Sequence, residues 1–226
     1  LLGAQNYVFG PGSGNVVNGL IPSTISNEDL GWEKTKQMNI GLELGLFNNR
    51  VFMEFDYYNS KTTDLLLYVP VPAITGFTNG LKNIGSVRNK GWELAINSRN
   101  FTGDLRWTTD FNISSNKNTV LALGPEGDII KAGHITKVGY PLGNYYGYVF
   151  EGIYNTQEEI DARPHLPSDA PGDPKIRDVN NDEIISADDR TILGDSYPDL
   201  FFGIGNNFSY KNFDLSIFLQ GVLGQE

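Results

Sequence analysis

The chain has 226 residues, a formal net charge of −10 and no cysteine. The acidity argues against a nucleic acid partner, because phosphate binding needs a basic patch and the sequence shows none. The lack of cysteine excludes disulfides and thiolate chemistry. Twenty-six glycines, eleven prolines and 12% aromatic residues are typical of an all-β protein with many turns.

No apolar run approaches the roughly 18 residues that a membrane-spanning helix needs, which leaves open a protein that crosses a membrane with strands. The chain starts Leu1-Leu2-Gly3, without an initiating methionine, so we expect a processed or excised piece of a longer protein. Residues 1–31 are rich in Gly, Asn, Ser and Pro and are predicted to form a loop.

The strongest pattern covers residues 33–62 and predicts a hairpin. Between residues 37 and 46 apolar and polar side chains alternate strictly, and the alternation resumes from 51 to 58. Side chains of a strand point to opposite faces with period two, so each strand has one apolar and one polar face. Asn48 and Asn49 suit the positive φ of the short turn between the strands.

Two further hairpins are predicted by the same alternation. Their strands are expected at 92–97 and 105–113, and at 200–208 and 213–220. Long connections at 64–87 and 121–199 separate the three hairpins, and residues 145–154 are expected to add local β structure.

Short turns within hairpins and long connections between them are typical of an outer-membrane barrel. Structureless connections above roughly 15 residues are uncommon in compact soluble domains. Aromatic residues near the strand ends fit the girdles of such a barrel: Phe47, Phe101, Tyr210 and Phe213 by the short turns, and Trp32, Tyr57 and Trp92 by the long loops. A soluble β-sandwich with one wet face alternates in the same way.

Residues 178–189 resemble an EF-hand calcium loop. Oxygen ligands stand at the required positions: Asp178, Asn180, Asp182, the carbonyl of Ile184, and Asp189. Glu183 replaces the usual glycine, and Asp189 replaces the usual bidentate glutamate. We expect a structural calcium ion here, and the alternative is an Asx-rich surface loop without an ion.

No catalytic motif is recognisable, so no enzyme is expected. His134 and His165, the two histidines, lie in predicted loops without a partner pattern. The second functional hypothesis is a soluble, calcium-stabilised β domain that binds glycans or partner proteins.

Several stretches together resemble the SusC/RagA family of TonB-dependent outer-membrane transporters. The first two are Leu30-Gly31-Trp32-Glu33-Lys34-Thr35 and residues 83–94, which include Asn83, Gly85, Asn89-Lys90-Gly91 and Glu93. The third is Gly139-Tyr140-Pro141-Leu142-Gly143 together with residues 147–148 and 152–154. The last two are Pro171-Gly172-Asp173 followed by residues 178–190, and residues 210–215 followed by Gln220-Gly221. Their order and spacing run from about residue 30 to the end.

The resemblance implies a portion of a 22-stranded transmembrane antiparallel β-barrel with long extracellular loops. Residues 1–226 would be barrel, and 121–199 would be an extracellular loop region. It also implies a SusD-like surface lipoprotein, energy from TonB through a segment outside this chain, and import of oligosaccharides or sometimes peptides. The location would be the outer membrane of a Bacteroidetes-like bacterium, in contact with its lipid. Because aromatic rings stack on sugars, the candidate substrate contacts are Tyr140, Tyr145, Tyr146 and Tyr148.

Overall fold

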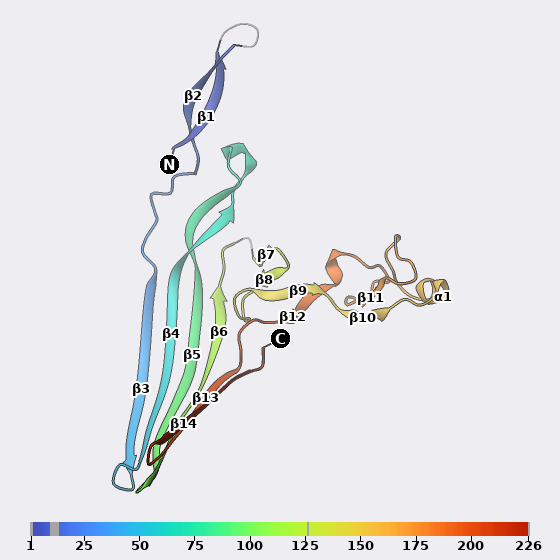
Figure 1. Ribbon diagram of the computed structural model, residues 1–226. Coiled ribbons are helices and arrows are strands. Elements are labelled where there is room, and N and C mark those ends of the chain that lie inside the picture. The colour runs from blue at the N-terminus through green and yellow to red at the C-terminus, as the bar shows by residue number, and fades with distance from the viewer. Residues whose placement is uncertain (1, 10–13, 126, 226) are drawn as a thin grey trace.

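The computed structural model describes residues 2–9, 14–125 and 127–225. A six-stranded antiparallel sheet forms its body, in the order β14-β13-β6-β5-β4-β3. The strands are β3 (Lys34–Leu46), β4 (Val51–Pro70), β5 (Asn79–Thr102), β6 (Leu105–Ala122), β13 (Leu200–Tyr210) and β14 (Phe213–Leu223). They run side by side with β3 and β14 at the edges, and the sheet does not close on itself (Figure 1).

The three predicted hairpins are confirmed. β3 pairs with β4, β5 with β6, and β13 with β14. The first turn has φ values of 54° to 60° at Phe47, Asn48 and Asn49, and the third has a φ of 55° at Lys211. Asparagine tolerates this left-handed conformation better than most residues, which is why Asn-Asn marked the first turn in the sequence.

Two predicted loops are wrong. Within residues 1–31, β1 (Leu2–Phe9) and β2 (Asn15–Pro22) form an antiparallel hairpin, because eight cross-strand pairs outweigh a composition that is typical of loops. The connection expected at 64–87 is also much shorter, since β4 continues to Pro70 and β5 begins at Asn79. A bulge at Asp64, whose φ is 60°, shifts the register there and breaks the period that revealed the strand.

The long connection between β6 and β13 has secondary structure of its own. Its four-stranded sheet has the order β12-β9-β8-β7, with β7 (Ile129–Lys131), β8 (His134–Thr136), β9 (Asn144–Tyr148) and β12 (Arg190–Gly194). The same connection also contains β10 (Phe150–Ile153), α1 (Gln157–Asp161), β11 (Pro174–Ile176) and a short 3-10 turn, η2 (Ala187–Asp189). A second 3-10 turn, η1 (Ala73–Thr75), lies in the connection between β4 and β5. The β structure predicted at 145–154 is confirmed.

Residues 149–189, which include β10, α1 and β11, form a projecting lobe that extends sideways from the sheet (Figure 1). Buried apolar side chains lie in this lobe and near the loop ends of the long strands: Val69, Val87, Val120, Ile135, Tyr154, Ile160 and Ile185. Within the described residues no second layer covers the six-stranded sheet (Figure 1). No helix in the described part of the chain is long and apolar enough to cross a membrane.

Candidate functional site

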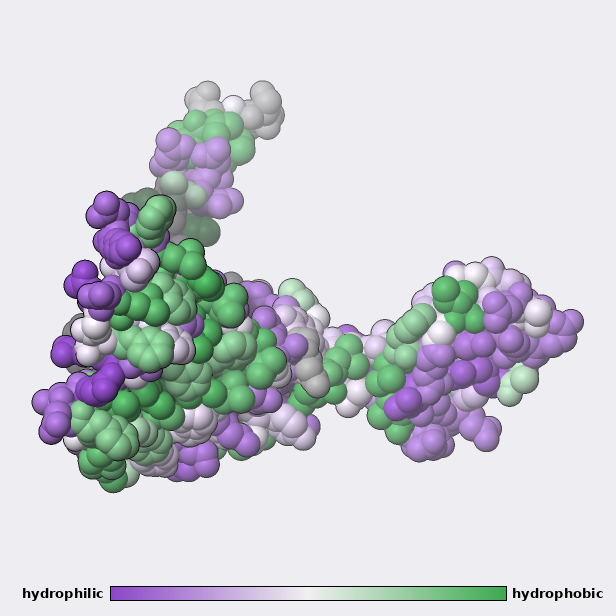
Figure 2. Space-filling model, turned by 60° about the horizontal axis from the view of Figure 1, so that its bottom comes forward, coloured by the Kyte–Doolittle hydropathy of each residue, from purple (hydrophilic) through white to green (hydrophobic). Residues whose placement is uncertain are grey.

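One side of the six-stranded sheet, here called the apolar face, carries most of the large apolar residues of its strands. The register aligns Leu42, Phe55, Leu94, Ile113 and Phe202 in one row across five strands. Leu42 is 54% exposed and Phe55 41%. Figure 2 shows hydrophobic residues spread over the body of the molecule, next to a mostly hydrophilic projecting lobe. A soluble monomer rarely exposes a contiguous apolar patch of this extent, so the face requires apolar surroundings.

Aromatic side chains bound the apolar face at both ends. At the end of the strands near the long connections, here called the loop end, Tyr57 lies directly opposite Trp92. At the end near the short hairpin turns, the turn end, the ring centroids of Phe101 and Trp107 are 5.6 Å apart. Trp92 and Phe101 are nine residues apart on β5, or about 30 Å along the strand. With the usual tilt of about 40°, the band is about 23 Å tall, close to the roughly 25 Å apolar band of an outer-membrane barrel.

The opposite side, here called the polar face, carries carboxylates from three strands. Glu43 of β3 lies opposite Glu54 of β4, and Asp56 of β4 lies opposite Glu93 of β5. Like charges directly opposite each other in a sheet repel. This part of the polar face therefore has a negative electrostatic potential and attracts cations.

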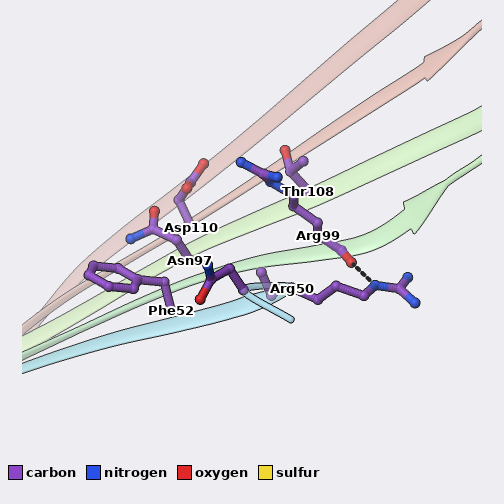
Figure 3. A pocket seen from close by; sticks show the side chains of 8 residues that line it. Arg50, Phe52, Asn97, Arg99, Thr108 and Asp110 are labelled. Carbon is purple, nitrogen blue, oxygen red and sulfur yellow. Dashed lines mark hydrogen bonds between the residues drawn. The ribbon is translucent and has the colours of Figure 1, made fainter. Parts of the chain in front are cut away.

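Nearer the short turns, the polar face is hollowed into a pocket of about 520 Å³ (Figure 3). Arg50 closes one side, where its guanidinium donates hydrogen bonds to the backbone oxygens of Arg99 and Asn100 at 3.3 and 2.7 Å. Arg99 and Asp110 bring opposite charges to the lining, so the pocket suits a polar rather than an apolar occupant.

Asn118 of β6 holds the loop that carries the candidate tyrosines. It is 5% exposed; its Oδ1 accepts the Leu142 N–H at 2.9 Å and its Nδ2 donates to Asn89 Oδ1 at 2.8 Å. Two backbone bonds continue this contact, from Val120 N to Tyr140 O and from Gly139 N to Val120 O. This anchor could not be predicted from the sequence, because an isolated asparagine in a strand carries no local signal.

The structure places three of the four predicted tyrosines on β9 and Tyr140 in the turn before it. Neighbouring residues of a strand face opposite ways, so Tyr145 and Tyr146 do not share a surface. The ring centroids of Tyr145 and His134 are 5.3 Å apart, and the Cζ atom of Arg190 lies 5.8 Å from the ring centroid of Tyr146. Tyr140 and Tyr148 are the two more exposed rings, at 44% and 37%. Substrate binding by these tyrosines stays a prediction.

In the projecting lobe, one carboxylate joins two arginines. Glu151 accepts hydrogen bonds from Arg177 Nε at 2.6 Å and from Arg163 Nη2 at 2.7 Å, and Arg163 also donates to Ile176 O at 2.9 Å. The bonds from Arg177 and then Arg163 hold the pKa of Glu151 below its ordinary value. This network connects β10 to β11 and to the segment after α1.

A second carboxylate fastens the start of α1. Glu159 accepts the Asn155 N–H at 2.9 Å and pairs with Lys175 at 2.7 Å. The Asn155 N–H and then Lys175 lower the pKa of Glu159 from 4.5 to about 2. Both partners favour the ionised carboxylate, so they stabilise the lobe while Glu159 is charged.

The stability of the lobe is expected to fall as the pH decreases from about 4.5 to about 2. A carboxyl whose pKa is depressed in the folded state stabilises fully above its unfolded pKa, and that contribution disappears as the pH falls through its folded pKa. Hydrogen exchange of residues 150–177, corrected for intrinsic rates, measures this loss. Glu159→Gln should shrink the acid-dependent part, and an undiminished acid response in that variant would contradict the prediction.

The predicted calcium ligands lie together in one loop of the lobe, with their oxygens already hydrogen bonded. Asp178 accepts the N–H groups of Asn181 and Glu183 at 2.7 and 2.8 Å, and buried Asp189 accepts those of Val179 and Ser186 at 2.8 and 2.7 Å. Of the remaining ligands, Asn180 donates a hydrogen bond from Nδ2 to Asp182 Oδ2, and Asp182 Oδ1 accepts the Ile184 N–H. Among the described residues, no three acidic, histidine or cysteine side chains converge as a metal site requires. Calcium binding stays a prediction.

An antiparallel sheet with a banded apolar face, aromatic ends and a polar opposite face defines a segment of a transmembrane β-barrel. The family profile "TonB dependent receptor-like, beta-barrel" matches residues 2–176, and the chain belongs to this family.

Two curated relatives support this assignment. The chain is 40% identical to TonB-dependent receptor P3 of Formosa agariphila over 223 residues, which are 93% of this chain and 22% of that protein. It is 33% identical to TonB-dependent receptor SusC of Bacteroides thetaiotaomicron over 213 residues, 87% of this chain and 20% of SusC. The chain thus spans about a fifth of the relatives that it matches.

The fold is also similar to a solved structure, that of the RagAB peptide transporter. The TM-score is 0.77 at 28% sequence identity, covering 99% of this chain and 24% of the transporter chain. The resemblance to SusC/RagA transporters is therefore confirmed, and the chain has the fold of a part of their barrel.

Proposed function

We propose that the protein containing this chain imports oligosaccharides across the outer membrane, with energy from TonB and a SusD-like surface lipoprotein. The observation that carries the proposal is the apolar face, which is exposed across six strands and bounded by aromatic side chains. The polar face would line the interior of the barrel, and the strands that pair with the open edges of β3 and β14 would come from the rest of the polypeptide.

The second hypothesis, a soluble β domain that binds glycans or proteins, fits these observations poorly. It leaves the apolar face in water, at about 25 cal/mol for each Å² of apolar surface. Purification separates the two hypotheses: a barrel requires detergent to remain dispersed, whereas a soluble domain does not.

Deletion of the gene tests the function. The deletion strain should lose growth on one class of oligosaccharide while its growth on peptides is unchanged, and removal of TonB should give the same defect. Growth lost on peptides instead would identify a peptide as the imported nutrient, as in the RagAB peptide transporter. Unchanged growth and uptake on both would refute the import function.

We also propose that calcium orders loop 178–189, on the strength of the alternating oxygen ligands in the sequence. Calcium should slow hydrogen exchange of this loop, and the Asp178→Asn/Asp182→Asn protein should not respond. Terbium luminescence, measured on both proteins, reports the ion directly. Equal exchange with calcium and with a chelator would refute the site.

A further inference from the structure

Five cations that are far apart in the sequence lie together on the apolar side of the sheet. This basic row comprises Lys36, Lys61, Arg88, Lys90 and Lys117. Lys36 lies opposite Lys61, Lys61 opposite Arg88, and Lys90 opposite Lys117. All five residues are exposed. Because they are spread over four strands, the sequence shows no basic patch, and only the register assembles one.

The basic row borders the loop end of the apolar face. Residues two apart on a strand share a face, so Lys90 and Arg88 point to the same side as Trp92, and Lys61 points to the side of Tyr57. On β6, Asn118 follows Lys117 and therefore points to the other side of the sheet, where it is buried and accepts the Leu142 N–H. The cations therefore face away from the loop and continue the surface of the aromatic girdle.

Within the described residues no carboxylate neutralises the basic row. Lys34, one step further along β3, pairs with Asp64 at 3.0 Å. None of the five residues of the row forms an ion pair with any other described residue. Like charges directly opposite each other in a sheet are destabilising, so this surface gains from a bound anion, although the chain has a net charge of −10.

The height of the basic row matches that of lipid head groups. One step of two residues places Lys90 about 7 Å beyond Trp92 along β5, and a second step places Arg88 about 13 Å beyond it. The tilt of the strands reduces both heights by about a quarter. The head-group region of a membrane is about 5–8 Å thick on each side of the hydrocarbon, so the row lies within it and just above it.

We propose that the basic row binds the phosphate groups of phosphorylated glycolipid in the outer leaflet of the outer membrane. This inference rests on the proposed function and on the expected extracellular position of residues 121–199, which together place the loop end of the sheet outside the cell. Neighbouring strands are about 4.8 Å apart, so Lys36, Lys61 and Arg88 span about 10 Å and can contact one phosphate or two adjacent ones. Arg88 adds a planar fork that matches a phosphate oxygen pair. The glycolipid thereby anchors the barrel on this side.

The test uses the full-length protein, purified in neutral detergent and titrated with purified lipid A by native mass spectrometry. Lys61→Gln/Lys90→Gln should weaken binding about tenfold or more, the size expected when two cations leave an anionic surface. The matched control, Lys131→Gln/Lys137→Gln, removes two exposed lysines of the β7–β8 loop region and should bind as the unmodified protein does. Lipid A without phosphates should bind weakly to all three.

Three results would overturn the assignment: unchanged affinity of the Lys61→Gln/Lys90→Gln protein, equal binding of the dephosphorylated lipid, or displacement of lipid A by millimolar inorganic phosphate. The last result would assign the row to soluble anions instead of lipid. Detergent dependence, measured on the same samples, distinguishes failure of this inference from failure of the import function. A protein that stays dispersed without detergent refutes the membrane location itself.

Discussion

Gly91→Ala is expected to lower the free energy of unfolding by about 3 kcal/mol, as overpacking of a tight site does. A Cβ at this position would overlap the backbone oxygen of Ser115 and lie 2.6 Å from Tyr58 Oη. The tyrosine cannot swing aside freely, because its hydroxyl donates a hydrogen bond to Asn116 Oδ1 at 3.0 Å. The result is measured as a decrease of the thermal unfolding temperature of the full-length protein in detergent.

Gly205→Ala is the matched control, because Gly205 also lies in a long strand of the sheet. The nearest atom to its added Cβ is a Phe218 ring carbon at 3.7 Å, an ordinary contact. We expect no loss of stability in this variant. An unchanged unfolding temperature for Gly91→Ala, or an equal decrease for both variants, would show that the contact with Tyr58 and Ser115 does not limit this position.

The hairpins could be predicted from the sequence where the strands cross the apolar band. There one face is apolar and the other polar, so the period of two is visible in the residue pattern, as between Met38 and Leu46. Beyond Tyr57 this contrast disappears, because Lys61 points to the same side of β4 as Val51 and is polar. The predicted hairpin therefore ended at residue 62, eight residues too early, although β4 stays paired with β5 up to Pro70.

The candidate site divides in the same way. Local patterns, such as the tyrosines of 140–148 and the acidic loop 178–189, could be found in the sequence, and their functions stay predictions. Contacts between distant residues could not be found. Glu151 accepts a hydrogen bond from Arg177, 26 residues away, and Lys36 lies in one row with Lys61 and Arg88 across three strands. Only the fold determines these neighbours.

Asn118→Leu is expected to release the loop at Leu142 from the sheet. The substitution leaves the partly buried Leu142 N–H and Asn89 Oδ1 without their partner, and a polar group left unsatisfied away from water costs about 1–3 kcal/mol. Hydrogen exchange of the amides of residues 139–148 should accelerate by at least about tenfold, because 1.4 kcal/mol corresponds to a factor of ten. Unchanged exchange at Leu142 would contradict the role of Asn118 as an anchor.

Two variants separate this anchor from a general effect of removing an asparagine. Asn112→Leu changes a residue of β6 on the same face that is exposed and forms no side-chain hydrogen bond within the described residues, so exchange in the loop should not change. Asn118→Asp keeps an acceptor for the Leu142 N–H and loses the donor to Asn89, so an intermediate rate is expected.

The same pair of leucine variants links the anchor to uptake. If Tyr140 and its neighbours contact the substrate, Asn118→Leu should slow import by a deletion strain complemented with it, at equal amounts of protein in the membrane. Asn112→Leu should not, because it leaves the loop in place. Faster exchange in the loop without slower import would show that the loop is held for a purpose other than substrate binding.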